Sequence, residues 1–491
     1  MTPHSESNVG KGGGNATMSR VKDFTGLTSD SRKVKPGYLF AALSGSKTDG
    51  AKFVQDAVGR GAIAVLGAPA IADDVAALGV RFIPDENPRA GLARYAAAFF
   101  AGQPDIVAAV TGTKGKSSIV AFLREIWTAL GKPAASLGTV GVIGPKGAMP
   151  LAHTTPDPVE IHALLAELKR DGVDHLAIEA SSHGLDQHRL DGVTISGCGF
   201  TNITRDHMDY HATFDDYLAA KLRLFTAVVK DGGVAVVNAD AEHAERFVQA
   251  ARSRGLSLIT VGRKGETIHL DRREDQGGSQ ALTLRHAGKI HHLVLPLAGD
   301  FQTSNALVAA GLAIGLGENP QQVFAALEHL KGAPGRMEKV AFAKLGAPIY
   351  VDYAHTPDSL EKVLQALRPH TAGKLHVMFG CGGDRDKGKR PLMGAIAVKL
   401  ADDVIVTDDN PRSEEPATIR SEILAAAKGA REIGDRAQAI RAAVESLGIG
   451  DVLVLAGKGH ETGQYIKDEV HPFSDREQAI DTAIALGGRA A

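Results

Sequence analysis

A glycine-rich loop carries the clearest chemical signal in this sequence. Residues 110–118 read Val-Thr-Gly-Thr-Lys-Gly-Lys-Ser-Ser, directly after an apolar run at 106–110 and before a helical pattern at 119–130. Gly112 and Gly115 let the backbone turn with its N–H groups pointing inward, and a helix start favours an anion at the same place. A strand, a tight loop and a helix start together predict a cradle for phosphate groups.

Two side chains extend this prediction to a nucleoside triphosphate. Lys116 offers a positive charge to the β- and γ-phosphates, and Ser117 offers a hydroxyl to Mg²⁺. The loop departs from the standard phosphate-loop pattern, because Val110 stands where the longer pattern has its first glycine. The alternative is a mobile surface turn rich in glycine and lysine. The strand-like and helix-like flanks favour phosphate binding.

Polar clusters follow two other apolar runs. Glu179 comes directly after the run at 175–178, and His207 lies in a polar stretch that follows residues 199–201. Ligands of open α/β sheets gather at the carboxyl ends of the strands, and Mg²⁺ takes one or two protein ligands beside a triphosphate. We therefore expect Glu179 and His207 to ligate Mg²⁺. The alternatives are a helix-capping glutamate and an ordinary loop histidine.

Length and composition set the class of the protein. A chain of 491 residues exceeds what one hydrophobic core usually organises, so about three domains are expected. The content of 44% hydrophobic and 23% charged residues, with a net charge of -2, is that of an ordinary soluble protein. This balance gives no bulk attraction to nucleic acid or membrane, and we expect neither as a partner.

The cysteines and the N-terminus point to a cytoplasmic location. Cys198 and Cys381 lie far apart in apolar, glycine-rich surroundings, which suits reduced core thiols. No segment approaches the roughly 18 consecutive apolar residues of a membrane helix, and the N-terminus lacks the apolar core of a signal peptide. Residues 1–18 are polar and glycine-containing, so we expect a disordered extension.

Apolar runs alternate with helical patterns along the whole chain, which predicts an α/β fold. We expect a small α/β domain at 19–103, a central domain with a mostly parallel sheet at 104–333 and a C-terminal α/β domain at 334–491. The expected strands are 37–43, 62–66, 106–110, 175–178, 234–238, 258–261, 349–352, 375–379, 404–407 and 452–456, and the expected helices include 53–59, 89–100 and 119–130. Residues 281–285 and 291–295 predict an inserted hairpin.

Six motifs taken together resemble those of the Mur ligases of peptidoglycan synthesis, over nearly the whole chain from Leu27. They are Thr111-Gly-Thr-Lys-Gly-Lys-Ser-Ser118, Glu179-Ala-Ser-Ser-His183, residues 202–211, Tyr217-Leu-Ala-Ala-Lys221, Pro334-Gly-Arg336 and Asp352-Tyr-Ala-His-Thr-Pro357. Three more are similar to motifs of the family members that add meso-diaminopimelate: Asp30-Ser-Arg32, Asp409-Asn-Pro-Arg412 and Gly457-Lys-Gly-His-Glu461. Lys114 departs from the family's usual asparagine, and Ser117 and Ser118 replace the more usual threonines.

The resemblance implies a three-domain fold with a UDP-binding N-terminal domain, a phosphate-loop ATPase domain and a Rossmann-like C-terminal domain. It implies a cytoplasmic, monomeric ligase that uses ATP and Mg²⁺. The implied substrates are UDP-MurNAc-L-Ala-D-Glu, whose D-Glu carboxylate becomes an acyl phosphate, and meso-diaminopimelate, whose amine then attacks it. Such chemistry needs positioning and charge neutralisation more than a side-chain nucleophile.

The resemblance also assigns the central site. The implied catalytic residues are Lys116, Glu179, His207 and Lys221. The implied metal ligands are Ser117, Glu179, His207 and Lys221, the last as a carbamylated lysine whose negative charge holds a second Mg²⁺. The alternative for Lys221 is a solvated surface lysine. The implied ATP contacts are Gly112, Thr113, Lys114, Gly115, Lys116, Ser117, Ser118, Asn305, Arg336 and His355. Arg336 could equally be an interdomain salt-bridge partner.

Two further sets of residues match substrate positions of the family. Those facing the UDP-dipeptide are Ser29, Ser31, Ser46, Lys47, Thr48, Thr154, Thr155, Ser181, Gln187 and Arg189; many are also ordinary turn formers. Those facing diaminopimelate are Arg385, Asp409, Asn410, Pro411, Arg412, Gly457 and Glu461. A guanidinium such as Arg412 is the natural bidentate partner of the second carboxylate, and lysine-adding relatives lack this arginine. The alternative is a basic loop, because Lys387, Lys389 and Arg390 lie in the same stretch as Arg385.

Two rival functions remain at this stage. A folylpolyglutamate synthetase would keep the ATP machinery but has no reason to carry Asp409-Asn-Pro-Arg412 or a UDP-type first domain. A nucleotide-dependent switch without chemistry would need the phosphate loop alone.

Overall fold

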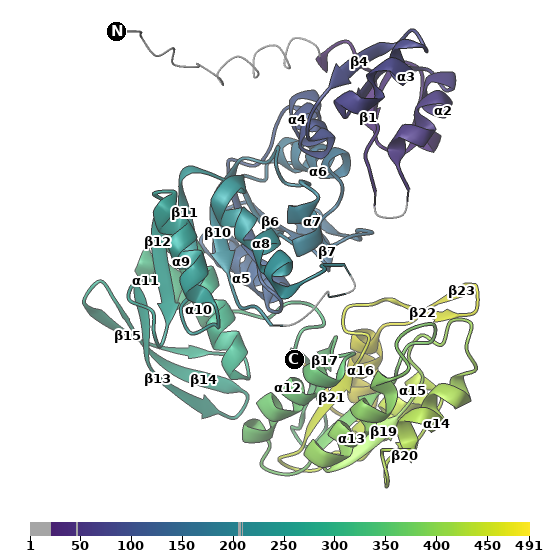
Figure 1. Cartoon of the computed structure of the whole chain (residues 1–491). Coiled ribbons are helices and arrows are strands. Elements are labelled where there is room, and N and C mark those ends of the chain that lie inside the picture. The colour runs from purple at the N-terminus through teal and green to yellow at the C-terminus, as the bar shows by residue number, and fades with distance from the viewer. Residues whose placement is uncertain (1–20, 46–47, 205–207, 209) are drawn as a thin grey trace. The chain divides into compact units, whose positions relative to one another are not determined.

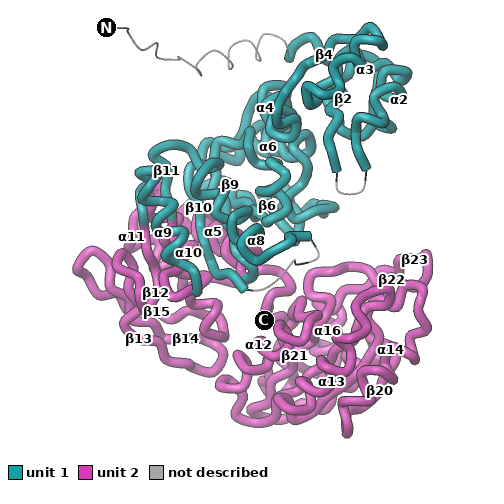
Figure 2. The backbone as a smooth tube through the Cα atoms, viewed as in Figure 1, with its two compact units in different colours: residues 1–114, 131–235, 242–258 teal, residues 115–130, 236–241, 259–491 magenta. Residues whose placement is uncertain are grey.

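A computed structural model of the protein describes residues 21–45, 48–204, 208 and 210–491. The expected extension at 1–18 lies outside the described residues, as do Ser46, Lys47 and His207. The chain falls into two compact units, which Figure 2 colours separately: residues 1–114, 131–235 and 242–258 form one, and residues 115–130, 236–241 and 259–491 form the other.

The N-terminal region is a small parallel α/β module, as predicted. Its four strands stand in chain order in the sheet: β1 (Gly26–Thr28), β2 (Tyr38–Ala41), β3 (Ala62–Gly67) and β4 (Arg81–Pro84). Its helices are η1 (Ser31–Lys33), η2 (Gly50–Phe53), α2 (Val54–Gly59), η3 (Pro69–Ile71), α3 (Ala72–Ala76) and α4 (Pro88–Phe100). Alternate residues of β2 and β3 face opposite sides, so Leu39 and Leu66 pack with α4 while Phe40 and Val65 pack with α2 and α3.

The central sheet contains eleven strands in the part of the chain that is described, in the order β15-β14-β13-β12-β11-β10-β5-β9-β6-β7-β8. The strands are β5 (Ile106–Thr111), β6 (Ala134–Gly138), β7 (Gly141–Gly144), β8 (Gly147–Met149), β9 (His175–Glu179), β10 (Ile195–Phe200), β11 (Val229–Asn238), β12 (Ser257–Gly262), β13 (Ile268–Gln276), β14 (Ser279–His286) and β15 (Lys289–Leu295). The helices are α5 (Lys116–Ala129), α6 (Pro158–Arg170), α7 (Ser182–Asp186), α8 (Phe214–Arg223), η4 (Leu224–Val228), α9 (Ala244–Ser253), α10 (Asp300–Gly315) and α11 (Pro320–Leu327).

The middle of this sheet is parallel, and its two ends are antiparallel. β5 pairs in parallel with β9 and β10, and its residues Val107 and Val110 are fully buried, as expected of a strand covered on both faces. The predicted hairpin is confirmed as β14 and β15, which turn at Ala287 and Gly288 with positive φ at both. β13 extends the hairpin into a meander, and β7 and β8 form another antiparallel edge. The sequence analysis predicted neither addition.

The C-terminal region is a sheet covered by helices on both faces (Figure 1). Its order is β20-β19-β18-β21-β17-β16-β24, and β22 pairs with β23 in a separate hairpin. The strands are β16 (Glu338–Phe342), β17 (Pro348–Asp352), β18 (Leu375–Phe379), β19 (Asp403–Val406), β20 (Arg431–Glu432), β21 (Val452–Ala456), β22 (Gly463–Ile466), β23 (Glu469–Pro472) and β24 (Arg489–Ala490). The helices are α12 (Pro357–Leu367), η5 (Arg368–His370), α13 (Lys389–Leu400), α14 (Pro416–Leu424), α15 (Arg436–Glu445) and α16 (Asp475–Ala485).

The period-two pattern of β21 explains these two layers. Val452 and Val454 pack in one core cluster with residues of α12, α13 and α14. Leu453 and Leu455 pack in the other cluster with residues of α15 and α16. A strand that is apolar on both faces therefore requires helices on both faces of the sheet.

Both cysteines are buried, Cys198 in β10 of the central sheet and Cys381 in the C-terminal core. Cys198 and Cys381 are free and buried, which confirms the prediction of core thiols. Burial raises the pKa of Cys198 well above its usual value and that of Cys381 to about 11, so both are protonated near neutral pH. None of the helices in the described ranges is long and apolar enough to cross a membrane.

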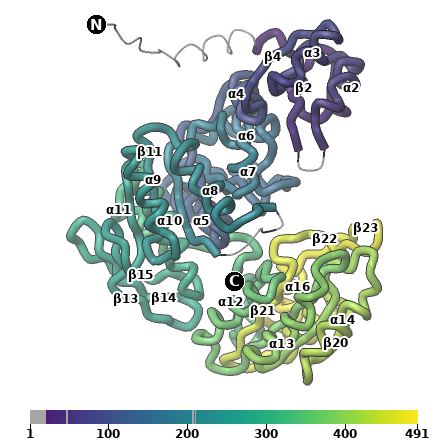
Figure 3. Tube along the Cα trace, in the orientation of Figure 1, coloured from purple at the N-terminus to yellow at the C-terminus, as the bar shows by residue number. Residues whose placement is uncertain are grey.

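A neutral histidine lies in the contact between α4 and α6, which run side by side in Figures 1 and 3. His162 of α6 is 3% exposed, and its Nε2 has no hydrogen-bond partner among the described residues. A Cβ on Gly192 would lie 2.5 Å from this nitrogen, so the ring is tightly enclosed. Burial lowers the pKa of His162 to about 4.

We expect acid to destabilise the protein through His162. Because its pKa is about 4 in the folded chain and near the ordinary 6.5 when unfolded, the unfolded chain binds more protons between these values. The free energy of unfolding therefore falls by on the order of 3 kcal/mol as the pH drops from above 6.5 toward 4. Urea midpoints followed by circular dichroism at about pH 7 and about pH 5 should show a smaller drop in His162→Leu than in the wild type. His329→Leu, at an exposed position, is the control. Equal drops in all three proteins would contradict the assignment.

Candidate functional site

Four neighbouring parallel strands end at one edge of the central sheet. Thr111 at the end of β5 pairs with Phe200 of β10, β9 lies on the other side of β5, and β6 pairs with β9. The segments that follow these strands therefore begin side by side. They contain the glycine-rich loop and the polar residues after β10, and Glu179 is the last residue of β9, so these groups meet at this edge as expected from the sequence.

Close contacts require both glycines of the loop. Gly112 has φ of 149°, and a Cβ there would lie 2.3 Å from the hydroxyl oxygen of Thr201. Gly115 has φ of 88°, and a Cβ there would lie 2.3 Å from Oδ1 of Asn305. A side chain at either position would collide with its neighbour in a backbone conformation that favours glycine. Asn305 of α10 therefore lies directly beside the loop.

The main chain of the loop is anchored to the segment after β10. The N–H of Lys114 donates to Oδ1 of Asn202 at 3.1 Å, and the Lys114 carbonyl accepts from the side chains of Asn202 and Thr201. The hydroxyl of Thr113 lies 2.8 Å from that of Tyr217 and accepts from the N–H of Thr204. The unusual lysine at position 114 is thus compatible with a firmly held loop.

The start of α5 presents its first turn next to this loop. Gly115 occupies the N-cap position in a left-handed conformation, and no side chain caps the helix start. Lys116 is partly exposed, whereas Ser117 and Ser118 are buried. The N–H groups of a first helical turn and the positive end of the helix dipole suit an anionic group such as a phosphate.

Glu179 ends β9 as a buried carboxylate that is 1% exposed. Its Oε1 accepts from the N–H of Thr139 at 2.8 Å, and its Oε2 accepts from the Thr139 hydroxyl at 3.1 Å. A Cβ on Gly138 would lie 2.1 Å from Oε1, so the glycine makes room for the carboxylate. Thr139, which the sequence analysis did not single out, orients Glu179 and also contacts the hydroxyl of Thr154 at 3.0 Å.

Lys221 is a buried residue, so the alternative of a solvated surface lysine is wrong. It is 1% exposed on α8, and its Nζ donates to the carbonyl of Gly112 at 2.8 Å. The same nitrogen lies 4.5 Å from the centroid of the Tyr217 ring. The side chain of Lys221 therefore lies against the first residue of the phosphate loop.

The predicted metal ligands fit a hard cation only in part. Glu179 and Ser117 offer oxygen donors, which Mg²⁺ prefers, and a carbamate on Lys221 would add another. His207 lies outside the described residues. Among the residues that are described, no group of three or more His, Cys, Asp and Glu side chains gathers in a metal-binding arrangement.

Four of the residues predicted to face the UDP-dipeptide form one hydrogen-bond network beside Glu179. The hydroxyl of Thr155 donates to the Glu179 carbonyl at 2.9 Å and accepts from the hydroxyl of Ser181 at 3.0 Å. Arg189 donates to the Thr155 carbonyl at 2.6 Å and to Oε1 of Gln187 at 2.8 Å. Ser181 also caps α7 through the N–H of Gly184, so part of its role is local.

Ser29, Ser31 and Thr48 of that set belong to the N-terminal region. Ser29 and Ser31 follow β1, and the hydroxyl of Ser31 bonds to Asp56 and lowers the pKa of that carboxyl. Asp30 caps the short helix η1 and pairs with Arg32 at 2.8 Å. Thr48 is exposed. Ser46 and Lys47 lie outside the described residues.

Arg336 and His355 both contact Tyr353. The guanidinium of Arg336 stands 4.6 Å from the centroid of the Tyr353 ring, and its buried Nε has no hydrogen-bond partner among the described residues. Nδ1 of His355 bonds to the Tyr353 carbonyl at 2.8 Å. Burial lowers the pKa of His355, so the ring is neutral near neutral pH. A Cβ on Gly335 would lie 2.1 Å from the backbone nitrogen of His460, so this loop passes close to the segment after β21.

A second row of strand ends lies at one edge of the C-terminal sheet. β19, β18, β21 and β17 are parallel neighbours, so the segments after them begin at the same edge. Those segments include residues 353–356, 380–388, 407–415 and 457–462. Both motifs expected to contact an amino acid therefore lie together.

Arg412 has its main chain fixed by β22. Its φ is 52°, its N–H donates to the carbonyl of Tyr465 at 3.0 Å, and its carbonyl accepts from the N–H of Lys467 at 2.7 Å. One guanidinium nitrogen donates to the carbonyl of Gly383 at 2.8 Å. A Cβ on Gly383 would lie 1.9 Å from the carbonyl oxygen of Pro411, so this glycine allows the two loops to touch.

The basic stretch around Arg385 divides into paired and exposed side chains. Arg390 is fully buried and pairs with Glu414 at 2.9 Å and with Glu422 at 2.7 Å. Hydrogen bonds from Arg390 and from the backbone of Asp384 lower the pKa of Glu414 to about 2. Arg385 itself is exposed and, within the part of the chain that the structure describes, donates to the Asp384 carbonyl at 3.3 Å. The basic-loop alternative therefore does not describe Arg390, which holds the loop together.

A buried lysine lies at the centre of the motif Gly457 to Glu461, although the sequence analysis gave it no role. Lys458 is fully buried, and its Nζ donates to Oδ1 of Asn410 at 2.9 Å and to the carbonyl of Gly463 at 2.6 Å. It also lies 3.3 Å from Oε2 of Glu461 and 4.0 Å from Oδ1 of Asp409. Lys458 thus ties the two amino-acid motifs to each other. The sequence signal that could have identified Lys458 was its position inside the motif Gly457 to Glu461.

A buried ion pair also holds the same two loops in place. Arg436 and Asp475 are both fully buried and pair at 2.6 Å. Arg436 also donates to the carbonyls of Asp408 and Ala456, each at 3.1 Å. These carbonyls precede Asp409 and Gly457, so the ion pair fixes the starting points of both motifs.

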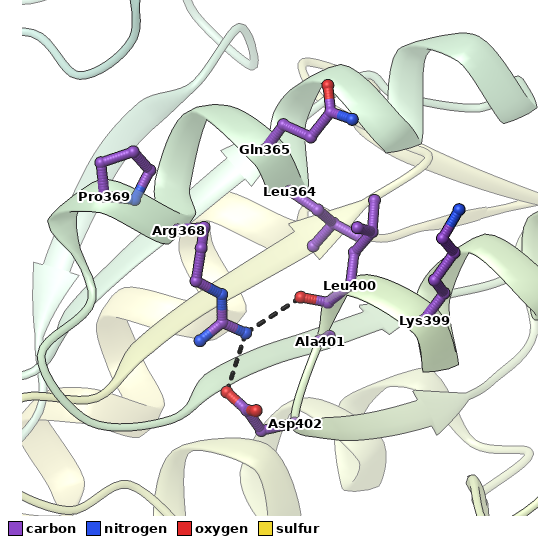
Figure 4. Close-up of a pocket in the computed structure, with 8 residues that line it drawn as sticks. All are labelled: Leu364, Gln365, Arg368, Pro369, Lys399, Leu400, Ala401 and Asp402. Atoms are coloured by element: carbon purple, nitrogen blue, oxygen red, sulfur yellow. Dashed lines mark hydrogen bonds and ion pairs between the residues drawn. The ribbon is translucent and has the colours of Figure 1, made fainter.

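A surface pocket lies elsewhere in the C-terminal region and holds none of the predicted site residues. Figure 4 shows it between α12, η5 and the segment that joins α13 to β19. Arg368 bridges it by donating to the carbonyl of Leu400 at 2.9 Å and to Asp402 at 2.8 Å.

Three family models match successive parts of the chain. The Mur ligase family catalytic domain matches residues 23–100, the Mur ligase middle domain matches residues 110–313, and the Mur ligase glutamate ligase domain matches residues 335–459.

Individual relatives match nearly the full length. The UDP-N-acetylmuramoyl-L-alanyl-D-glutamate–2,6-diaminopimelate ligase of Bradyrhizobium diazoefficiens is 57% identical over 469 residues, 94% of this chain and 95% of the relative. The protein of the same name from Agrobacterium fabrum is 54% identical over 463 residues, 94% of each chain. A solved structure with that name is 33% identical, with a TM-score of 0.71 over 94% of this chain and 95% of the other. The chain therefore belongs to the Mur ligase family.

Proposed function

We propose that this protein is an ATP-dependent ligase that adds meso-2,6-diaminopimelate to the D-Glu carboxylate of UDP-MurNAc-L-Ala-D-Glu. The relatives that are 54% to 57% identical over nearly the whole chain carry the name of this activity. The reaction takes place in the cytoplasm and releases ADP and phosphate, and the protein acts as a monomer. Its product is a UDP-linked tripeptide precursor of peptidoglycan.

The observation that carries the proposal is the arrangement at the edge of the C-terminal sheet. The guanidinium of Arg412 stands in the same loop as Asp409 and Asn410, next to the motif that ends at Glu461. A cation beside carboxylates is complementary to the carboxylate and ammonium of an amino-acid end group. The second such end group is what distinguishes diaminopimelate from lysine. Arg385, Pro411 and Gly457 complete this proposed binding site.

The proposed reaction begins with transfer of the γ-phosphoryl group of ATP to the D-Glu carboxylate. The amine of diaminopimelate then attacks the acyl phosphate, and phosphate leaves. Gly112 to Ser118 cradle the phosphates, with Lys116 as a fixed positive charge, and Asn305, Arg336 and His355 contact the nucleotide. Positioning and charge neutralisation are the main contributions that a protein makes to such a transfer.

Mg²⁺, when bound, neutralises the phosphate charge. Ser117, Glu179, His207 and carbamylated Lys221 are the residues we propose to hold it. The buried carboxylate of Glu179 and the buried side chain of Lys221 beside Gly112 support this assignment.

We further propose that the three regions of the chain bind different substrates or parts of a substrate. Residues 19–103 bind the UDP group through Ser29, Ser31 and the loop at 46–48. Residues 104–333 bind ATP and the muramoyl dipeptide, the latter through Thr154, Thr155, Ser181, Gln187 and Arg189. Residues 334–491 bind diaminopimelate.

Incubation with ATP, UDP-MurNAc-L-Ala-D-Glu and meso-diaminopimelate tests the proposal directly. We expect ADP, phosphate and the UDP-tripeptide, and no tripeptide when any substrate is left out. Nucleotide binding without turnover would favour a switch, and amide formation only with glutamate and a folate would favour a folylpolyglutamate synthetase.

Lys116→Ala should abolish ADP formation and leave the fold intact, because the side chain is partly exposed in the phosphate cradle. ADP release by a coupled assay measures the first effect, and circular dichroism together with the fluorescence of the single tryptophan, Trp127, measures the second. Lys169→Ala, at an exposed position on α6, is the matched control. A folded Lys116→Ala protein with near wild-type turnover would show that the loop is not the phosphate site.

Lys221→Ala should lose activity mainly through weaker metal use, because the proposed carbamate acts as a carboxylate ligand. We expect the rate to depend on a higher Mg²⁺ concentration and to recover in part when a short-chain carboxylic acid is added. Steady-state rates over a Mg²⁺ series measure both effects, with the exposed Lys230→Ala as control. Full activity of Lys221→Ala without any supplement would refute this role.

Arg412→Ala should weaken the use of meso-diaminopimelate while barely changing the constants for ATP and the UDP-dipeptide. Loss of one partner of a desolvated, bidentate charge pair costs on the order of 2 to 5 kcal/mol, which is roughly 30-fold to several-thousand-fold in kcat/KM. Measurements of kcat/KM for diaminopimelate and for lysine decide the matter, with Arg441→Ala, an exposed arginine of α15, as control. Equal losses for both amines would make Arg412 structural.

A further inference from the structure

We propose that Lys458 is the positioning residue that arranges Asn410 and Glu461 for the amine substrate. The inference rests on the proposed function, because it concerns the same amino-acid site. In this proposal, the fully buried ammonium of Lys458 joins the two motifs that lie together at the edge of the C-terminal sheet.

The ammonium of Lys458 has acceptors for all three of its protons. Asn410 Oδ1 lies at 2.9 Å, the Gly463 carbonyl at 2.6 Å and Glu461 Oε2 at 3.3 Å. A buried charge is costly unless it is paired and hydrogen-bonded, and here it is both. The side chain of Lys458 is therefore held in one place.

This placement fixes which way the amide of Asn410 faces. Its Oδ1 accepts from Lys458 and from the N–H of Tyr465 at 3.1 Å, so its Nδ2 is directed to Glu461 Oε2 at 2.9 Å. Both donors would face a donor if the amide were turned over. Lys458 thus fixes the orientation of the Asn410 amide, and the Nδ2 of that amide in turn donates to one oxygen of Glu461.

The two carboxylate oxygens of Glu461 therefore have different partners. Oε2 accepts from both Asn410 and Lys458, whereas no hydrogen bond to Oε1 is recorded among the described residues. The side chain is 29% exposed, so Oε1 remains accessible to an incoming ammonium group. Without Lys458, Glu461 would lose one of the two donors to Oε2, and Asn410 would lose the contact that orients it.

Lys458 also balances the charge of the site. Glu461 and Asp409 both lie within 4.0 Å of its Nζ, so two carboxylates share one buried cation. Other charged or titratable groups that interact with these carboxylates are Arg436 and Tyr353, which interact with both, and His355 and Cys381, which interact with Asp409. Removal of the ammonium takes away the cation that the two carboxylates share, so the repulsion between them is no longer offset.

Lys458→Met tests the proposal, because it keeps the length of the side chain and removes the charge. We expect kcat/KM for diaminopimelate to fall by about 100-fold, as is typical when one partner of a buried pair is removed. The loss should appear as a raised KM for diaminopimelate, since Glu461 is then less well oriented toward the substrate ammonium, while the KM values for ATP and the UDP-dipeptide stay near those of the wild type. Lys428→Met, the same change at an exposed lysine, should behave as wild type.

The amine-independent half of the reaction separates positioning from a general loss of structure. Formation of the acyl phosphate can be followed by exchange of label between ADP and ATP, which requires the UDP-dipeptide but no amine. The rate of this exchange in Lys458→Met should stay within about threefold of the wild-type rate. Equal losses in exchange and in diaminopimelate use, or an unchanged kcat/KM for diaminopimelate, would overturn the proposal. Wild-type protein without exchange or tripeptide formation would instead refute the proposed function.

A second variant covers the case in which Lys458→Met does not fold. Lys458→Met/Glu461→Gln removes both charges and leaves no unpaired carboxylate at position 461. If the ammonium serves this network, the double variant folds, as judged by circular dichroism, and uses diaminopimelate poorly. A double variant that also fails to fold would show that Lys458 is a packing residue and would overturn the proposal.

Discussion

The parallel register of neighbouring strands is the constraint on which the proposed chemistry depends. In the central sheet, β6, β9, β5 and β10 end together, and in the C-terminal sheet β19, β18, β21 and β17 do the same. Polar residues that are far apart in sequence therefore reach one edge without any special pairing between them. Glycines then allow the loops to approach: Gly112 meets Thr201, Gly115 meets Asn305, and Gly383 meets Pro411 at distances that leave no space for a Cβ.

Buried charges then fix the loops at these edges. In the C-terminal region, Arg436 ties the starts of two loops to α16 through Asp475, Arg390 ties two loops through Glu414, and Lys458 joins the ends of the same two motifs. Each cation is fully buried and paired, so its removal would leave an uncompensated carboxylate. With these cations engaged in ion pairs, we propose that Arg412 and one oxygen of Glu461 face the amine substrate.

Much of this arrangement could be predicted from the sequence, because continuous apolar runs mark buried parallel strands. Strands β18 and β21 have the predicted bounds, and β5, β9 and β17 differ by one residue. The antiparallel additions β7, β8 and β13 were missed, since their short or polar segments lack a long apolar run. The positions of Glu179 at a strand end and of Arg412 in a loop followed from motifs. The roles of Thr139, Arg436 and Lys458 did not, because a burial partner distant in sequence leaves no local pattern.

The central claim is that this ligase recognises the second amino-acid end group of its amine substrate. A competition measures this most directly: ATP, UDP-MurNAc-L-Ala-D-Glu and equal concentrations of meso-diaminopimelate and L-lysine are mixed with the protein, and the products are weighed by mass spectrometry. The account predicts that nearly all of the UDP-tripeptide carries diaminopimelate. A product that carries lysine in comparable amount would contradict it.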